Sequence, residues 1–244
     1  KLKLNKRIHM KKILFLIIAM TSGSIFAQDI SRHEMHQFTH MQITNLPAVI
    51  AAMDSFASSD CGKKYPADVG LMQEVVNGTK QSTHFFIVSY EKMSDFQKAR
   101  DLTATCPAEA KFYADILKSG STQITDYTIV PVVEKKDWYM DTVFMKYDMQ
   151  LSLADEAAYT KAWSELMDNN VEAGFVKSSY GLNRVNFGSD ALSHFVYIGG
   201  SSIEDVNPDL TSTKAYAKFA KKVSGMREVV NTSLIMPVKS WPKQ

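Results

Sequence analysis

Residues 82–90 read STHFFIVSY, and residues 192–200 read LSHFVYIGG. Each stretch is a short apolar run that contains a His-Phe pair, His84-Phe85 in the first and His194-Phe195 in the second. Runs of this length, rich in aromatic and β-branched residues, predict buried β-strands. Nearly the same strand therefore occurs twice, which raises the question of an internal repeat.

Three further pairs of segments match in the same order along the chain. Residues 40–43 (HMQI) match 148–151 (DMQL), Gly70-Leu71 matches Gly181-Leu182, and residues 128–132 (TIVPV) match 234–238 (LIMPV). In chain order of the first copy, the four offsets are 108, 111, 110 and 106 residues. Four ordered matches at a nearly constant offset predict that one small unit has been duplicated.

The first unit has a readable order of elements. Strands are expected at 38–44, 69–76, 83–90 and 124–133. A helix is expected over 46–58, with Asn45 as its cap and Pro47 in its first turn. A second helix is expected from Ser94 to about Leu117, with a break near Pro107. The order is β-α-β-β-α-β.

The second unit repeats this order after a charged link at residues 134–137 (EKKD). Its strands are expected at 142–152, 175–187, 192–199 and 227–238, and its helices at 156–167 and about 211–223. The sequence thus predicts a first unit over 28–134 and a second over 138–244.

The element order β-α-β-β-α-β is that of the ferredoxin-like, split βαβ arrangement. Both helices cover one face of an antiparallel sheet, and the bare face must be buried against something else. Two tandem units predict an α+β fold in which the two sheets pack face to face. In this respect, residues 35–240 resemble the dimeric α+β barrel (antibiotic-monooxygenase-like) superfamily in its tandem, single-chain form.

The resemblance implies several activities, because that superfamily includes small monooxygenases, haem-handling enzymes, isomerase-like proteins and members without a known activity. The fold by itself does not select a chemistry. The sequence specifies no cofactor and leaves the oligomeric state open.

The first residues have the pattern of a secretory signal peptide. Met10-Lys11-Lys12 is a positive start, residues 13–20 (ILFLIIAM) are apolar, and a cleavage site fits after Ala27. The apolar run is too short to span a bilayer as a helix of the mature protein, although a retained anchor is the alternative. A periplasmic or extracellular location is expected, with no stable membrane span once the leader is removed.

Charge argues against nucleic acid as a partner. Residues 1–27 hold six of the 28 basic residues and none of the 26 acidic ones, so the mature chain has 22 basic residues and a net charge of −4. A mildly acidic protein without a basic run lacks the electrostatic footprint of a nucleic-acid-binding protein.

The two cysteines, Cys61 and Cys106, both lie in the exported part. In an oxidising compartment, an isolated pair predicts a structural disulfide. The alternative is a redox-active pair, which usually has a CxxC spacing that is absent here.

Strand alternation sorts the candidate ligand-binding residues. Met41, Ile43, Met149 and Leu151 share one parity and are expected to face the helices. The opposite parity carries polar side chains that must be paired or meet a ligand or water, and Arg184 adds a cation on a neighbouring strand. The candidates on this basis are His40, Gln42, Lys146, Asp148, Gln150 and Arg184.

His84 and His194 are the candidate catalytic residues, because both copies keep the histidine in the same position. A histidine titrates near neutral pH and can transfer protons or bind a metal. The alternative is structural: each histidine follows a hairpin turn, hydrogen-bonds locally, and was inherited from a shared ancestor. The sequence does not decide between these interpretations.

No metal site is predicted. His33, His36 and His40 have spacings of three and four residues, but they lead into a strand near the start of the mature chain, where fraying is common. The sequence also lacks HExxH, CxxC, a glycine-rich phosphate loop and a GxSxG elbow.

Three hypotheses for function follow. The first is an exported binding protein that holds a small, partly apolar molecule between its sheets. The second is a small monooxygenase-type or haem-handling enzyme that uses a strand histidine. The third is a structural envelope protein with a filled core and no pocket, in which the polar side chains pair with one another.

Overall fold

The structure, a computed structural model, describes residues 32–188 and 192–244. The predicted leader, residues 28–31 and residues 189–191 lie outside the described residues. Eight strands form the centre of the fold: β1 (Met35–Gln42), β2 (Asp68–Val76), β3 (His84–Tyr90), β4 (Thr122–Lys135), β5 (Val143–Leu151), β6 (Tyr180–Gly188), β7 (His194–Gly200) and β8 (Arg227–Trp241).

The strands close into one antiparallel barrel with the order β1-β3-β2-β8-β5-β7-β6-β4. The strands of 35–135 form one half and those of 143–241 the other. The halves join edge to edge through the β2–β8 and β4–β6 pairs. The sequence predicted two sheets packed face to face. The two halves do face each other, but as the walls of a single barrel with a shared interior.

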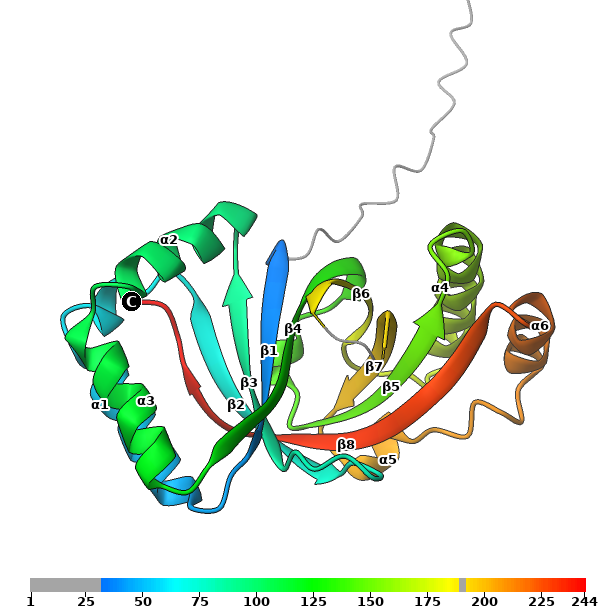
Figure 1. Cartoon of the computed structure of the whole chain (residues 1–244). Helices are drawn as coiled ribbons and strands as arrows, with labels where there is room; N and C mark the ends of the chain where they lie inside the picture. Colours follow the sequence, from blue (N-terminus) through cyan, green and yellow to red (C-terminus); the bar gives the residue numbers. More distant parts are fainter. Residues whose placement is uncertain (1–31, 189–191) are drawn as a thin grey trace, which may run out of the picture.

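Helices cover the outside of the barrel at its two ends (Figure 1). The first half carries α1 (Leu46–Ala57), α2 (Met93–Thr103) and α3 (Pro107–Lys118), and the second half carries α4 (Glu156–Glu172), α5 (Ile203–Val206) and α6 (Lys214–Lys222). Two short 3-10 helices complete the fold: η1 (Gly62–Lys64) follows α1, and η2 (Trp138–Met140) links the halves. Within the described ranges, no helix is long and apolar enough to cross a membrane.

Local sequence explains where the helices of the first half begin and end. The Asn45 side chain accepts a hydrogen bond from the backbone N–H of Ala48 at 3.2 Å, and Pro47 occupies the first turn of α1. Pro107 cannot donate a backbone hydrogen bond, so it starts α3 rather than continuing α2. The helix predicted from Ser94 to Leu117 is therefore two helices.

Two boundaries at the end of α4 differ from the expectation. Helix α4 was expected to end near residue 167 but continues to Glu172, and β6 begins only at Tyr180, whereas a strand was expected from residue 175. The short helix α5 was not expected. Gly174 has a φ of 76°, a conformation that ends the helix at little cost for glycine. The apolar residues Phe175 and Val176 belong to the connection, where Val176 packs into the core.

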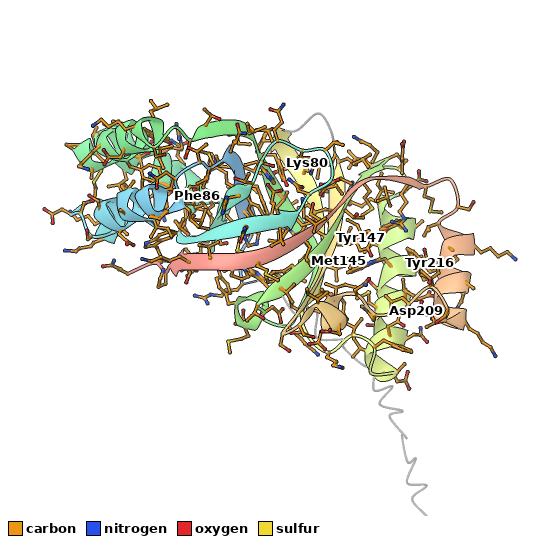
Figure 2. The ribbon with its side chains drawn as sticks, turned by 90° about the horizontal axis from the view of Figure 1, so that it is seen from below. Lys80, Phe86, Met145, Tyr147, Asp209 and Tyr216 are labelled. Atoms are coloured by element: carbon orange, nitrogen blue, oxygen red, sulfur yellow. A yellow bond between two sulfur atoms is a disulfide. The ribbon has the colours of Figure 1, made fainter. Side chains whose placement is uncertain are left out.

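The apolar core consists of separate clusters inside and outside the barrel. The interior cluster includes Phe38, Phe85, Tyr127, Phe144 and Phe195. A second cluster lies between the first-half strands and α1 and α3, and a third between the second-half strands and α4 and α6. Figure 2 shows Phe86, from the second cluster, near one end of the molecule and Tyr147 with Tyr216, from the third, near the other.

The disulfide joins Cys61, just after α1, to Cys106, the N-cap residue of α3. It therefore ties the end of one helix to the start of another on the outer face of the first half.

Candidate functional site

A chain of polar and charged side chains lies buried inside the barrel. The Nδ1 atom of His40 is 3.2 Å from the Glu74 carboxylate, and its Nε2 atom is 3.1 Å from the Tyr127 hydroxyl. Lys146 donates to the same hydroxyl at 3.2 Å and pairs with Asp148. All five residues have exposed fractions of 8% or less.

Lys80 completes this interior network from the loop between β2 and β3. Its ammonium group pairs with the second carboxylate oxygen of Asp148, while about 30% of its side chain stays exposed. The network thus contains two carboxylates and two ammonium groups, and it reaches solvent at Lys80. Buried charges require such pairing, because an unpaired charge in the interior is very costly.

The surroundings set the protonation of the interior network. Burial alone would raise the pKa of Asp148, but Lys146 and Lys80 outweigh it and lower that pKa to about 2. Burial lowers the pKa of His40 despite the neighbouring Glu74. Burial opposes ionisation of Glu74, but the contact with His40 brings its pKa below the ordinary value. At neutral pH, a neutral His40 therefore lies between a carboxylate and a phenol, where Nδ1 can donate a hydrogen bond to Glu74 and Nε2 can accept one from the Tyr127 hydroxyl.

Only part of the ligand-binding set predicted from parity meets in the interior. His40, Lys146 and Asp148 lie there together. Gln42 and Gln150 are exposed near the ends of β1 and β5 and do not join this buried group. Parity gives the face of a strand but not the depth along it, and both residues lie near the ends of their strand pairs.

Arg184 also lies outside the interior. Its guanidinium contacts the Glu156 carboxylate of α4 at 3.0 Å, on the helix-covered face of the second half. The neighbouring residue, Asn183, faces the interior instead. Successive residues of a strand point to opposite faces, so only one of Asn183 and Arg184 can face the barrel interior.

His84 and His194 share one local arrangement. Each is the first residue of its strand, and its Nδ1 lies within hydrogen-bond distance of the preceding hydroxyl: Thr83 at 2.9 Å for His84 and Ser193 at 3.0 Å for His194. Those hydroxyls also bond to the backbone of Ile43 and Leu151, at the ends of β1 and β5.

Beyond that shared contact the two histidines differ. The Nε2 of His194 is 2.9 Å from the carboxylate of Glu156, whereas the Nε2 of His84 has no hydrogen-bond partner in the described parts of the chain. Neither histidine lines the cavity inside the barrel or the larger cavity beneath the helices of the first half. The arrangement fits the structural interpretation of the pair.

The N-terminal histidines lie on β1 or just before it. His33 is 3.3 Å from Asp68, His36 is 2.8 Å from Ser89, and the rings of His33 and His36 are 5.3 Å apart. In residues 32–188 and 192–244, no three His, Cys, Asp or Glu side chains are grouped closely enough to hold a metal ion.

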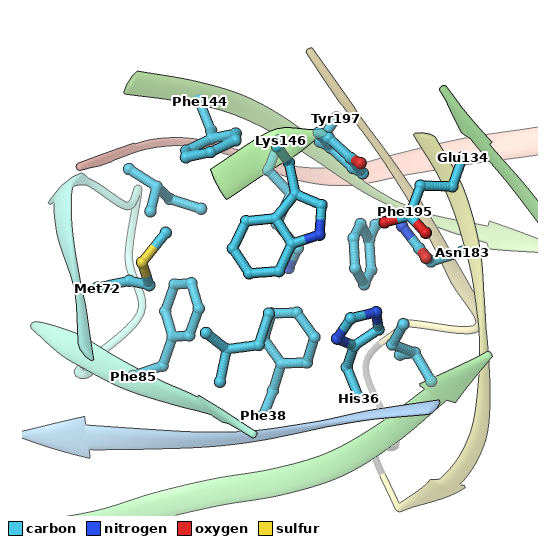
Figure 3. A pocket seen from close by; sticks show the side chains of 14 residues that line it. His36, Phe38, Met72, Phe85, Glu134, Phe144, Lys146, Asn183, Phe195 and Tyr197 are labelled. Atoms are coloured by element: carbon cyan, nitrogen blue, oxygen red, sulfur yellow. The ribbon is translucent and has the colours of Figure 1, made fainter. Parts of the chain in front are cut away.

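The barrel interior leaves a cavity of only about 60 Å³ (Figure 3). Aromatic and aliphatic side chains, among them Phe38, Phe85 and Phe144, form most of its wall. Lys146 and Asn183 are among its polar members. At about 10–15 Å³ for each water molecule, this space has room for about four to six water-sized groups and not for a drug-sized ligand.

A larger cavity, here called the helix-covered pocket, lies on the outer face of the first half. It measures about 470 Å³, within the usual range for small-molecule sites. Strands β1, β3 and β4 form its floor, and α1, α2 and α3 form its walls. Its apolar lining includes Met41, Met53, Phe56, Phe86, Phe112 and Ile116.

The mouth of the helix-covered pocket is polar. Arg100, at the end of α2, lines it and forms no ion pair with any of the described residues. Tyr65, Tyr90 and Tyr113 also line the pocket, and the hydroxyls of Tyr65 and Tyr90 are 3.2 Å apart. Burial raises the pKa of all three phenols, which keeps them protonated as hydrogen-bond donors. The nearby carboxylate of Glu109 also raises the pKa of Tyr113.

Two positions on the buried helix face carry larger side chains in the second half. The buried face of α1 consists of Val49, Ala52, Met53 and Phe56, and the residues 110 positions later on α4 are Tyr159, Ala162, Trp163 and Leu166. Tyrosine thus stands in place of valine and tryptophan in place of methionine, whereas Leu166 is smaller than Phe56.

The residues of the helix-covered pocket do not fit haem. Haem iron is usually held by His or Cys, and neither residue lines this pocket among the described residues. A tyrosinate ligand is disfavoured because burial raises the pKa of the lining phenols. The interior cavity is bordered by His36 but is far too small for a porphyrin.

No protein-family model and no curated protein matches this sequence. Solved structures do match its fold. A "putative monooxygenase" from Lactobacillus acidophilus NCFM has a TM-score of 0.55 and 11% identity, covering 86% of this chain and 96% of that chain. The chain has the dimeric α+β barrel fold.

Two other similar structures cover as much of the chain. A "putative monooxygenase" from Fusobacterium nucleatum subsp. nucleatum has a TM-score of 0.54 and 14% identity, covering 88% of this chain and 96% of that one. An anthrone oxidase-like protein has a TM-score of 0.57 and 7% identity, with coverages of 86% and 93%. At these identities, the similarity extends to the fold and not to residue roles.

Proposed function

We propose that this protein binds a small, largely apolar molecule with an anionic head group in the helix-covered pocket. The observation that carries the proposal is the combination of an apolar cavity of about 470 Å³ with Arg100 at its mouth. A guanidinium without a protein partner is suited to a carboxylate, and the nearby phenols can donate further hydrogen bonds. The apolar floor would hold a hydrocarbon chain or ring.

This site differs from the one expected between the two sheets. The interior cavity is too small for such a ligand, and His40 and Asp148 are already paired within the interior network. In the barrel interior, those contacts agree with the hypothesis of a filled, structural protein. The helix-covered pocket is the reason to prefer a binding protein.

The binding test is displacement of a fluorescent fatty acid, cis-parinaric acid, by decanoate or decanol. We expect decanoate to displace the probe more strongly than decanol. Arg100→Met should weaken decanoate binding roughly 10- to 100-fold, since hydrogen bonds to charged groups contribute about 1.5–3 kcal/mol. It should leave decanol almost unchanged.

The matched control is Arg32→Met, which removes an exposed arginine that does not line the pocket. Equal loss of decanoate binding in both variants would contradict the proposal. So would a protein that binds neither compound, and that result would favour the structural hypothesis.

An enzyme of the monooxygenase type is the second candidate. The fold similarity to two proteins described as monooxygenases favours it, as does a carboxylate, Glu109, within the helix-covered pocket. The strand histidines do not line this pocket, so Glu109 would be the base. Oxygen uptake with a bound phenol that is lost in Glu109→Gln, while binding persists, would support the enzyme. Binding without oxygen uptake in the wild type would support the binding protein.

We further propose that the chain is exported and that its halves arose by duplication. The leader pattern and the joined pair of cysteines support export. The matching element order and the constant offset of 110 between the buried faces of α1 and α4 support duplication into units over 28–134 and 138–244. A mature N-terminus at Gln28, measured on protein from the native compartment, is the expected result. An intact leader would contradict cleavage after Ala27, and recovery of the protein from the cytoplasm with reduced cysteines would contradict export.

A further inference from the structure

The wall of the interior cavity is almost entirely apolar. Aromatic rings and branched aliphatic side chains form most of it, among them Phe38, Phe85, Phe144, Phe195, Ile129 and Ile235. Figure 3 shows Phe85 and Met72 at one side of the cavity, and Glu134 beside Asn183 at the other. The cavity therefore presents a carbon surface to whatever enters it.

Most polar side chains that border the cavity interact with other parts of the protein. Lys146 is held within the interior network. The Nδ1 atom of His36 is 2.8 Å from the hydroxyl of Ser89. Tyr197 and Glu134 likewise interact with other residues of the chain. A water molecule in the cavity would therefore lack the about two to four hydrogen-bond partners that a buried water normally has, and we expect the cavity to be dry.

Contacts between the rings keep this space open. The centre of the Phe38 ring lies 5.2 Å from that of Phe85, 5.3 Å from that of Tyr127 and 5.6 Å from that of Phe195. Aromatic pairs at these distances attract one another, so the rings are held in place. The strands behind them belong to a closed barrel. An empty space costs its wall dispersion contacts on one side, and a molecule that fills the space restores them.

A few side chains separate the interior cavity from a second space. Trp138, in η2, lines both the interior cavity and a cleft of about 300 Å³. Met72 and Phe144 border both spaces as well. Trp138 is only partly buried. Rotation of these side chains would therefore admit a small molecule while the strands of the barrel stay paired.

We propose that the barrel interior is a second binding site, which takes one small, uncharged, apolar molecule of the size of dioxygen. The volume of about 60 Å³ limits the ligand to about two to four non-hydrogen atoms, and the wall offers it dispersion contacts. Phe85 lines this cavity, whereas the next residue, Phe86, lines the helix-covered pocket on the opposite face of β3. The strands thus separate the two sites, and the proposal does not depend on what the helix-covered pocket binds.

The first test is a crystal structure of the full mature chain under xenon pressure. Xenon is apolar and small enough for the cavity, and its anomalous scattering locates it. We expect a xenon atom inside the barrel, in contact with the rings of Phe38, Phe85 and Phe144. An interior without xenon, or one occupied by ordered water instead, would overturn the proposal.

Isoleucine variants give a matched comparison. Ile235→Phe adds a ring to the wall of the interior cavity, and Ile116→Phe adds the same ring to the wall of the helix-covered pocket. The first should remove the interior xenon, and the second should keep it. Ile235→Val, a smaller change that the fold tolerates better, enlarges the cavity and should raise the xenon occupancy at a given pressure. Interior xenon that persists in Ile235→Phe, disappears in Ile116→Phe or declines in Ile235→Val would contradict the site.

Dioxygen itself is tested in solution by NMR of the methyl groups, because this paramagnetic molecule speeds the relaxation of nuclei that it contacts. Met72 and Ile235 line the interior cavity, whereas Leu182 is fully buried and lines neither this cavity nor the helix-covered pocket. Raising the oxygen pressure should speed the relaxation of the Met72 and Ile235 methyl groups more than that of Leu182. Equal enhancement at all three residues would contradict binding of dioxygen inside the barrel.

Discussion

His40 and Asp148 occupy matching positions in the two halves, 108 residues apart, and meet in one buried network. His36, two positions before Phe38 on the same strand, is also buried, and burial with the nearby His33 lowers its pKa to about 3. These residues hold protons differently in the folded and unfolded chains. Their burial therefore makes stability depend on pH.

The free energy of unfolding should fall on acidification. This loss should begin at a pH well above the pKa of ordinary carboxyl groups. The unfolded state takes up a proton on His36 near pH 6.5, but the folded state does so only near pH 3, so stability is lost as pH falls between these values. Asp148 adds a second loss between about pH 4 and pH 2.

Urea unfolding at pH 7, 6, 5 and 4 measures this loss. His36→Asn should reduce the slope of the free energy of unfolding against pH, between pH 6 and pH 4, by up to about 1.4 kcal/mol per pH unit, the value for one proton. Tyr159→Phe, which changes no group that titrates there, should keep the wild-type slope. A free energy of unfolding that is constant from pH 7 to pH 4 would contradict it.

At the residue scale, alternation predicted the faces of β1 and β5 well. Met41 and Met149 pack under the helices, and His40 and Asp148 point inward. The helix-covered pocket was not predicted residue by residue, because Arg100 lies on an exposed helix face that sequence alone cannot distinguish from a solvated one. The tyrosines around it come from three different elements, and only the fold brings them together.

At the element scale, the first half depends on the joint between α2 and α3. Pro107 separates the two helices, and Cys106 fixes the joint to the end of α1 through Cys61. Helices α1, α2 and α3 form the walls of the helix-covered pocket. The disulfide therefore fixes the shape of this pocket in addition to stabilising the fold.

Replacing both cysteines by serine should lower the free energy of unfolding by about 4 kcal/mol, from the chain-entropy relation for a loop closed across 45 residues. Urea unfolding with and without a reductant measures this loss. The same variant should bind cis-parinaric acid less tightly, because the walls of the pocket are less fixed. Unchanged stability in the reduced wild type would show that the disulfide does not stabilise the fold.

The larger side chains on the buried face of α4 indicate which substitution on α1 should fill the helix-covered pocket. Met53→Trp places in the first half the side chain that Trp163 provides in the second. We expect it to abolish binding of cis-parinaric acid while circular dichroism stays that of the folded protein. The reciprocal variant, Trp163→Met, should leave binding intact. Retained binding in Met53→Trp would mean that the ligand lies elsewhere.

At this scale, the sequence predicted every strand and most helix boundaries, because periodicity, caps and prolines are local signals. It misplaced the start of β6, since Phe175 and Val176 look like strand residues although they lie in a connection. Only the packing around the end of α4 decides their conformation.

At the scale of the whole molecule, closure of the barrel separates two kinds of space. The interior is shared by both halves and is nearly filled, with a cavity of about 60 Å³. The outer faces belong to one half each, and they differ: tyrosine and tryptophan lie on the buried face of α4, whereas valine and methionine take the matching positions of α1, beside the cavity of about 470 Å³. The repeat predicted two equivalent halves, and it could not predict this difference, because matching positions carry different side-chain volumes.

The helix-covered pocket of the first half is proposed to bind an apolar acid. A crystal structure of the protein with 10-bromodecanoate would locate the ligand, since anomalous scattering reveals the bromine atom. We expect the bromine between the strands and α1 near Met53 and Phe56, with the carboxylate at Arg100. A bromine inside the barrel or beneath α4, or a pocket left empty at saturating ligand, would contradict it.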